Sequence, residues 1–173
     1  MQRSVTPGIW EQKKSSPFGG ARNNYMPNTY VSNILHIVFH IKAKGTPFLD
    51  VDLQRIYQYI GGVVKGLGAI LIEIGGTSNH VHLLVSLPKT MSLADFMRTV
   101  KAESSRWIKT INPYYGGFSW QNGYGAFSVS ASVLPKVKQY ILNQEEHHKT
   151  LTFRDEYKAF LQAYGIEYDE RYL

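Results

Sequence analysis

The order of strand-like and helix-like segments along this chain is the feature that most restricts its fold. Alternating apolar and β-branched residues indicate strands, whereas apolar residues three and four positions apart indicate helices. The predicted strands cover residues 30–43, 69–76, 80–87 and 118–130, and the predicted helices cover 51–67, 93–110, 133–149 and 153–165. The first six segments follow the order βαββαβ, which is typical of a ferredoxin-like (RRM-like) α+β domain with an antiparallel sheet and helices on one face. The helix at 133–149 is additional to that unit.

Two serines are predicted to cap helices. Ser92 precedes the helix at 93–110, and Asp95 lies three residues later, as in a capping box. Ser132 precedes the helix at 133–149, where Pro135 is tolerated in the first turn. Gly123 and Gly125 are predicted bends in the strand region before that helix.

Composition excludes several classes of protein. The 173 residues include no cysteine, so disulfides, thiolate zinc sites and cysteine nucleophiles are excluded. We find no apolar run near the roughly 18 to 20 residues of a membrane span and no signal peptide, so we expect a cytoplasmic protein without a membrane partner. The net charge of +6 weakly favours a polyanionic partner. Residues 1–25 lack any helical or strand period, and we interpret them as a leader or added extension before a single domain at 26–173.

His80 and His82 begin the predicted strand HVHLLVSL. Residues two apart in a strand point to one face, about 6.5 to 7 Å from each other. Two imidazoles at this spacing can converge on one metal ion. The alternative is a pair of polar histidines on a solvated face, and the pair by itself does not separate the two.

The helix at 133–149 adds a second polar pair. At 100° per residue, Tyr140 and Gln144 lie one turn apart on the stripe expected to face the sheet. A buried amide needs a hydrogen-bond partner. A metal held by the two histidines would provide that partner for Gln144. In the alternative, Gln144 bonds to a backbone group and Tyr140 is an ordinary core residue.

Other polar residues have weaker patterns. His147 and His148 suit a helix C-terminus, with phosphate or metal contact as the alternative. Four cations line the polar side of the helix at 93–110, and with nearby aromatic residues they could bind a single strand of DNA. A solvated helix face is the alternative. The cations are Arg98, Lys101, Arg106 and Lys109, and the aromatic residues are Trp107, Trp120 and Tyr124.

Taken together, these motifs resemble one family. NHVHLLVSLP resembles the HUH motif, in which two histidines flank a bulky apolar residue, and YILNQ resembles the tyrosine helix of the single-tyrosine HUH transposases. MPNTYVSNILHIVFHIK and the stretch from GYGAFSV to EEHHK are similar to the same family. Its members move insertion sequences as single-stranded DNA, and they include transposases associated with repetitive extragenic palindromes. The resemblance covers residues 26–173.

The resemblance implies a mechanism. His80 and His82 match the two histidine metal ligands, Gln144 the third ligand, and Tyr140 the nucleophile that forms a 5′-phosphotyrosine link and releases a 3′-OH. The ion would be Mg²⁺ or Mn²⁺, and no nucleotide cofactor is needed. The partners would be single-stranded DNA with hairpins and a second copy of the chain, because the family acts as homodimers in which the tyrosine helix can complete the partner's site.

Two other functions stay open. A domesticated palindrome-processing nuclease, or a rolling-circle-type initiator or relaxase, would use the same chemistry for another purpose. A non-catalytic nucleic-acid-binding module would need neither the paired histidines nor an inward glutamine.

Overall fold

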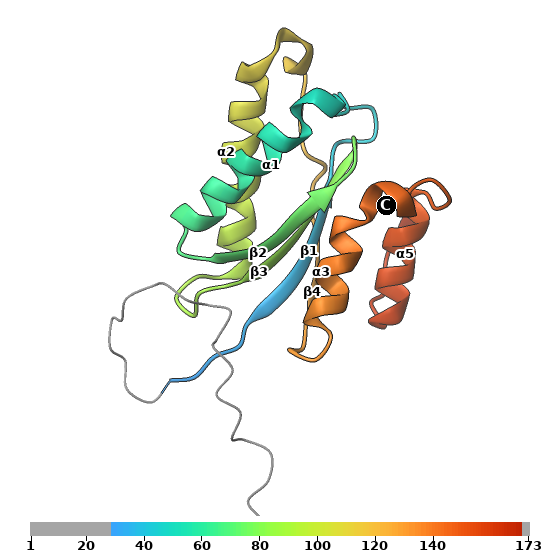
Figure 1. Ribbon diagram of the computed structural model, residues 1–173. Coiled ribbons are helices and arrows are strands. Elements are labelled where there is room, and N and C mark those ends of the chain that lie inside the picture. Colours follow the sequence, from blue (N-terminus) through green and yellow to red (C-terminus); the bar gives the residue numbers. More distant parts are fainter. Residues whose placement is uncertain (1–28, 171–173) are drawn as a thin grey trace, which may run out of the picture. The chain divides into compact units, whose positions relative to one another are not determined.

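The structure, a computed structural model, describes residues 29–170 (Figure 1). The predicted leader at 1–25 lies outside the described residues. The strands are β1 (Ile34–His40), β2 (Ile70–Gly76), β3 (His80–Ser86) and β4 (Gly125–Ser128). The helices are α1 (Asp50–Gly66), α2 (Leu93–Ile111), α3 (Leu134–Leu142), α4 (Gln144–His147) and α5 (Phe153–Ala163), with a 3-10 turn, η1 (Pro113–Tyr115). The predicted α+β class is confirmed.

The four strands form one antiparallel sheet in the order β2-β3-β1-β4. This is the order expected of a ferredoxin-like unit. The central pair, β1 and β3, is in register with Val38 opposite His82 and His40 opposite His80. The histidines of two different strands are thereby brought to neighbouring positions on one face of the sheet.

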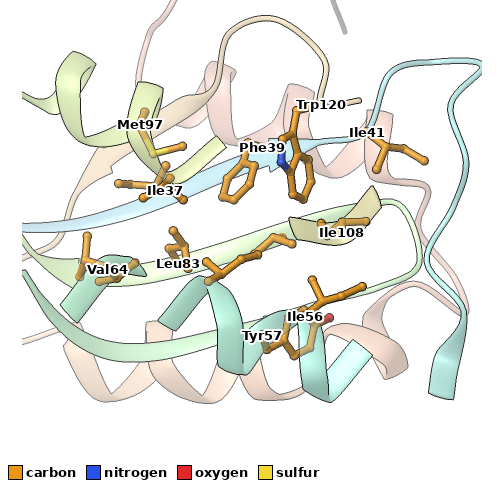
Figure 2. Packing of buried hydrophobic residues seen from close by; sticks show 14 of the residues in the cluster. Ile37, Phe39, Ile41, Ile56, Tyr57, Val64, Leu83, Met97, Ile108 and Trp120 are labelled. Carbon is orange, nitrogen blue, oxygen red and sulfur yellow. The ribbon is translucent and has the colours of Figure 1, made fainter. Parts of the chain in front are cut away.

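Helices α1 and α2 cover one face of the sheet (Figure 1). Alternate residues of the central strands, such as Ile37, Phe39 and Leu83, point toward these helices and are fully buried. Figure 2 shows them packed against Ile56 of α1 and Ile108 of α2. This apolar layer is the main hydrophobic core.

Helices α3 and α5 cover the opposite face (Figure 1). Ile141 of α3 packs with Leu84, whereas Tyr157 and Leu161 of α5 pack with Val38. Helix α3 approaches β2 so closely that a Cβ added at Gly75 would lie 2.5 Å from the Ile141 carbonyl oxygen. Glycine at this position therefore sets how near α3 comes to the sheet.

Several predicted boundaries differ from the structure. The strand predicted at 30–43 is limited to β1, and the region 118–130 contains only β4 and an isolated bridge between Ile41 and Trp120. A left-handed Gly123 (φ 82°) bends this region as predicted, whereas Gly125 is not a bend and begins β4. The helix predicted at 133–149 is divided at Asn143, whose φ of −100° and ψ of 19° lie in the bridge region between the helical and extended conformations.

One predicted cap is confirmed and the other is wrong. The Ser92 side chain accepts a hydrogen bond from the Asp95 amide, as expected. Ser132 does not cap α3: its hydroxyl pairs with Ser130, and the helix begins after Val133 without a side-chain cap. The physical reason is that the helix begins one residue later, at Leu134, so that Val133 and not Ser132 occupies the N-cap position.

Among the described residues, no helix is both long and apolar enough to cross a membrane.

Candidate functional site

His80 and His82 lie at the beginning of β3 on the face covered by α3 and α5. Alternation along the strand sends Val81 and Leu83 into the main core and both imidazoles to the other side. Both histidines are fully buried. They are therefore not the polar pair on a solvated face that the sequence left open.

Each imidazole is oriented by a contact at its Nδ1 atom. His80 Nδ1 lies 2.7 Å from Asn79 Oδ1 and 3.0 Å from the Thr77 hydroxyl. His82 Nδ1 lies 2.8 Å from Nε2 of His36, on the neighbouring strand. These contacts leave the Nε2 atoms of His80 and His82 facing the space below α3 and α5. In metal sites, a contact at one ring nitrogen commonly orients a histidine so that its other nitrogen can bind the metal.

Gln144 and Tyr140 reach the same space from the tyrosine helix and the turn that follows it. Gln144 is 1% exposed, and its Oε1 lies 3.2 Å from His80 Nε2. The ring of Tyr140 lies edge-on to His82, with centroids 6.0 Å apart. The structure thus brings together the predicted ligands and the predicted nucleophile, although about 60 residues separate the two pairs.

Glu156 on α5 is a site residue that the sequence analysis missed. It is 3% exposed and accepts hydrogen bonds from the Tyr140 hydroxyl and from Gln144 Nε2. Its other oxygen, Oε2, lies 3.5 Å from His82 Nε2 and 3.8 Å from His80 Nε2. The signal was present in the sequence: an acidic residue on the inward stripe of an amphipathic helix, between Phe153 and Phe160.

Burial controls the protonation of this cluster. Burial, assisted by the nearby His82, lowers the pKa of His80 to about 3, and burial likewise lowers the pKa of His82. Burial raises the pKa of the Tyr140 hydroxyl, and its hydrogen bond to Glu156 acts in the same direction. Burial alone would raise the pKa of Glu156, but its contacts with His82, Tyr140 and His80 outweigh burial and hold that pKa below its ordinary value.

The donor atoms fit a divalent cation. A neutral His80 has a single N–H, and the amide oxygen of Asn79 can only accept it, so the Nε2 lone pair faces the Gln144 and Glu156 oxygens. His82 Nε2 is buried and has no hydrogen-bond partner among the described residues. Ligand atoms of His80, His82 and Glu156 all lie within 4.8 Å of one another. A proton or a metal ion between these acceptors would satisfy them, and neutral imidazoles are the form that binds metals.

Residues 29–144 match the family described as "Transposase IS200 like". The chain belongs to this family. Two curated relatives are the ISDra2 transposase of Deinococcus radiodurans and the transposase for insertion sequence element IS200 of Salmonella typhimurium. The first is 27% identical over 64% of this chain and 83% of its own length. The second is 24% identical over 66% of this chain and 78% of its own length. Membership implies DNA cleavage and strand transfer.

A solved structure of a tyrosine transposase associated with REP sequences, bound to a REP hairpin, has the same fold. Its TM-score is 0.54 at 13% identity, and the match covers 75% of this chain and 76% of that one. The family match ends at Gln144, so Glu156 and the whole of α5 lie beyond it in this IS200-like transposase.

The remaining histidines of the transposase have definite contacts. His148 Nε2 lies 3.1 Å from Gln144 Oε1 and 3.2 Å from Glu156 Oε2, so this histidine borders the site. His147 packs beside Tyr140, with ring centroids 4.8 Å apart. His40 contacts the Ile41 carbonyl oxygen through Nδ1, at 2.9 Å.

The predicted DNA-binding cations are not brought to this site, because they lie on α2, across the sheet from the histidines. Arg98 pairs with Asp95 and Arg106 with Glu103. Lys101 donates to the carbonyl oxygens of Gln121 and Gly123 and holds that loop in place. A role for Arg98, Lys101, Arg106 and Lys109 in DNA binding stays a prediction.

The predicted stacking aromatic residues also have partners within the chain. Trp120 is buried in the main core, where its indole N–H donates to Ser104. Trp107 stacks on Tyr59, with ring centroids 4.2 Å apart. Trp120 is therefore a core residue and does not offer a ring to DNA bases.

Proposed function

We propose that this transposase cleaves and rejoins single-stranded DNA at hairpin-bearing element ends, with Tyr140 as the nucleophile. One observation carries the proposal. The Tyr140 hydroxyl and the Nε2 atoms of both HUH histidines converge on a single carboxylate, that of Glu156. A phosphate group in the place of this carboxylate would touch the nucleophile and the metal-binding side of the site at once.

His80, His82 and Gln144 would hold the metal ion. A divalent cation there would polarise the scissile phosphate and neutralise charge in the transition state. Two imidazoles and one amide favour Mn²⁺ over Mg²⁺, because Mg²⁺ prefers oxygen ligands and Mn²⁺ accepts nitrogen more readily. His36 and Asn79 would keep the two imidazoles in the orientation that presents Nε2.

Tyr140 would act by nucleophilic substitution at phosphorus. Its phenolic oxygen forms a bond to phosphorus as the bond from phosphorus to the 3′-oxygen breaks, and the departing 3′-oxygen takes up a proton. The result is a 5′-phosphotyrosine link and a free 3′-OH. In the second step another 3′-OH attacks the same phosphorus, and Tyr140 regains its proton. One phosphodiester replaces another, so no ATP is needed.

Helix α5 has to move aside for DNA to reach this site. His80 and His82 are fully buried, and the Phe153 ring stacks on His80 with centroids 4.6 Å apart. In this conformation the helix excludes a DNA backbone from the imidazoles. Within one chain Tyr140 lies beside His82. In the proposed homodimer, the helix that carries Tyr140 would complete the site of the partner.

Hairpin DNA is the proposed substrate because the structurally similar REP-associated transposase is described as bound to a hairpin. The test uses a hairpin-bearing single strand labelled at its 3′ end, incubated with Mn²⁺ and separated on a denaturing gel. The wild-type protein should retain the label as a covalent adduct, and Tyr140→Phe should not. Tyr114→Phe, at an exposed tyrosine, is the matched control and should behave as wild type.

Two results would count against the proposal. An adduct formed by Tyr140→Phe would exclude this nucleophile. The absence of any adduct with wild-type protein across a panel of hairpins would favour a non-catalytic nucleic-acid-binding module.

A further inference from the structure

Glu156 connects the proposed nucleophile to the proposed metal site through its two oxygens. Oε1 accepts hydrogen bonds from the Tyr140 hydroxyl and from Gln144 Nε2, which lies 3.1 Å away. Oε2 faces Nε2 of His82 at 3.5 Å and Nε2 of His80 at 3.8 Å. The side chain is almost completely buried, and the third group beside Oε2 is His148 Nε2, at 3.2 Å.

These separations suit atoms that share one ion. Two ligands of a small divalent cation lie roughly 3 to 4.5 Å apart, because each is about 2.0 to 2.3 Å from the metal. The distances from His80 Nε2 to Gln144 Oε1 and from both imidazoles to Glu156 Oε2 fall within that range. His82 Nε2, buried and without a hydrogen-bond partner among residues 29–170, points toward the same position.

We propose that Glu156 is a further metal ligand, which α5 contributes to the site while no DNA is bound. This inference rests on the metal site of His80, His82 and Gln144 proposed above. Those three ligands are neutral and only one of them offers oxygen, whereas Mg²⁺ and Mn²⁺ prefer anionic oxygen. The Glu156 carboxylate would supply both the charge and the oxygen that the set lacks.

The packing of α5 places this carboxylate firmly. Thr152 caps the helix by accepting a hydrogen bond from the Asp155 amide. Phe153 stacks on His80, and Phe160 lies edge-on to His36 with centroids 5.2 Å apart. Two aromatic anchors, one on each side of Glu156, thus fix it against the sheet. Since the family match ends at Gln144, this ligand comes from a segment that the family pattern does not describe.

Metal binding by the DNA-free protein tests the inference without reference to catalysis. Free Mn²⁺ is measured by electron paramagnetic resonance during titration of wild type, Glu156→Gln and the control Glu146→Gln. Glu146 is an exposed carboxylate on α4 that pairs with Lys149, so the control removes the same charge away from the site. Glu156→Gln should bind Mn²⁺ at least about tenfold more weakly than wild type, and Glu146→Gln should bind it within about twofold. Equal affinity of wild type and a folded Glu156→Gln overturns the inference.

A second experiment needs no variant. Crystals of the wild-type protein grown with Mn²⁺ give an anomalous difference peak at the ion. A peak about 2.0 to 2.4 Å from Glu156 Oε2 supports the inference. A peak bound to His80 and His82, with Glu156 turned away, overturns it.

The two proposals fail separately. If Glu156→Gln loses Mn²⁺ affinity but wild type forms no DNA adduct, the ligand stands and the transposition chemistry fails. If wild type forms the adduct but Glu156→Gln binds Mn²⁺ as wild type does, the chemistry stands and the ligand fails.

Discussion

The two faces of the sheet are built from the same strands but have opposite character. Toward α1 and α2, the strands present only apolar side chains to a single continuous core. Toward α3 and α5, small apolar clusters flank a buried polar group. The members of that polar group are His36, His80, His82, Gln144 and Glu156.

Along β3, the residues that stabilise the fold alternate with the residues of the candidate site. Burying a polar group costs free energy unless the group has a hydrogen-bond partner. The polar groups around the histidines bond to one another, and His82 Nε2 is the exception among them. The apolar face provides the stability that allows such a group to be held in place. We therefore expect substitutions on the two faces to give different phenotypes.

The largest expected effect comes from His82→Ala. Loss of an imidazole that is proposed to hold the cation should reduce adduct formation by at least about a thousandfold, equivalent to roughly 4 kcal/mol of transition-state stabilisation. The measurement is the rate of adduct formation with 3′-labelled hairpin DNA in Mn²⁺, with circular dichroism to verify folding. A folded variant that reacts at the wild-type rate would show that the polar face is structural.

Leu83→Ala, one residue further along β3, tests the opposite face. Its side chain is fully buried in the main core, so the free energy of unfolding should fall by about 2 to 5 kcal/mol. Urea denaturation measures the loss. Adduct formation per folded molecule should stay at the wild-type level, and a selective loss of activity would mean that the two faces are not independent.

Gly75→Ala perturbs the packing of α3 on the sheet. The new Cβ would meet the Ile141 carbonyl, so we expect a loss of about 1 to 3 kcal/mol in the free energy of unfolding. Gly62→Ala is the matched control, because an added Cβ on this exposed position of α1 has no atom within 4 Å. It should stabilise the protein by about 0.5 to 1 kcal/mol. Similar effects of the two substitutions would argue against close contact at Gly75.

The smallest effect compares how helices on the two faces begin. Ser92→Ala removes the cap of α2 and should lower the free energy of unfolding by about 1 kcal/mol. Ser132→Ala, before α3, should change it by no more than about 0.5 kcal/mol, because Ser132 caps nothing. Thermal denaturation of both variants measures the difference, and equal losses would restore Ser132 as a cap.

Local periodicity explains why much of this architecture could be predicted. Alternation in HVHLLVSL correctly placed His80 and His82 on one face, and the helical stripe correctly turned Tyr140 and Gln144 inward. The ferredoxin-like strand order followed from the order of the segments. The break at Asn143 was not predictable from periodicity, because the inward stripe runs through it without interruption.

The sequence by itself determined the α+β class through the order of its segments, and the inward direction of the four motif residues through their local spacing. The family followed from the resemblance of its motifs. Only the tertiary structure decided what those residues meet. Glu156 joins them because α5 docks on the same face as α3, and His36 supports His82 because β1 pairs with β3 in one register. Contacts between distant segments depend on how whole elements pack, which no local pattern records.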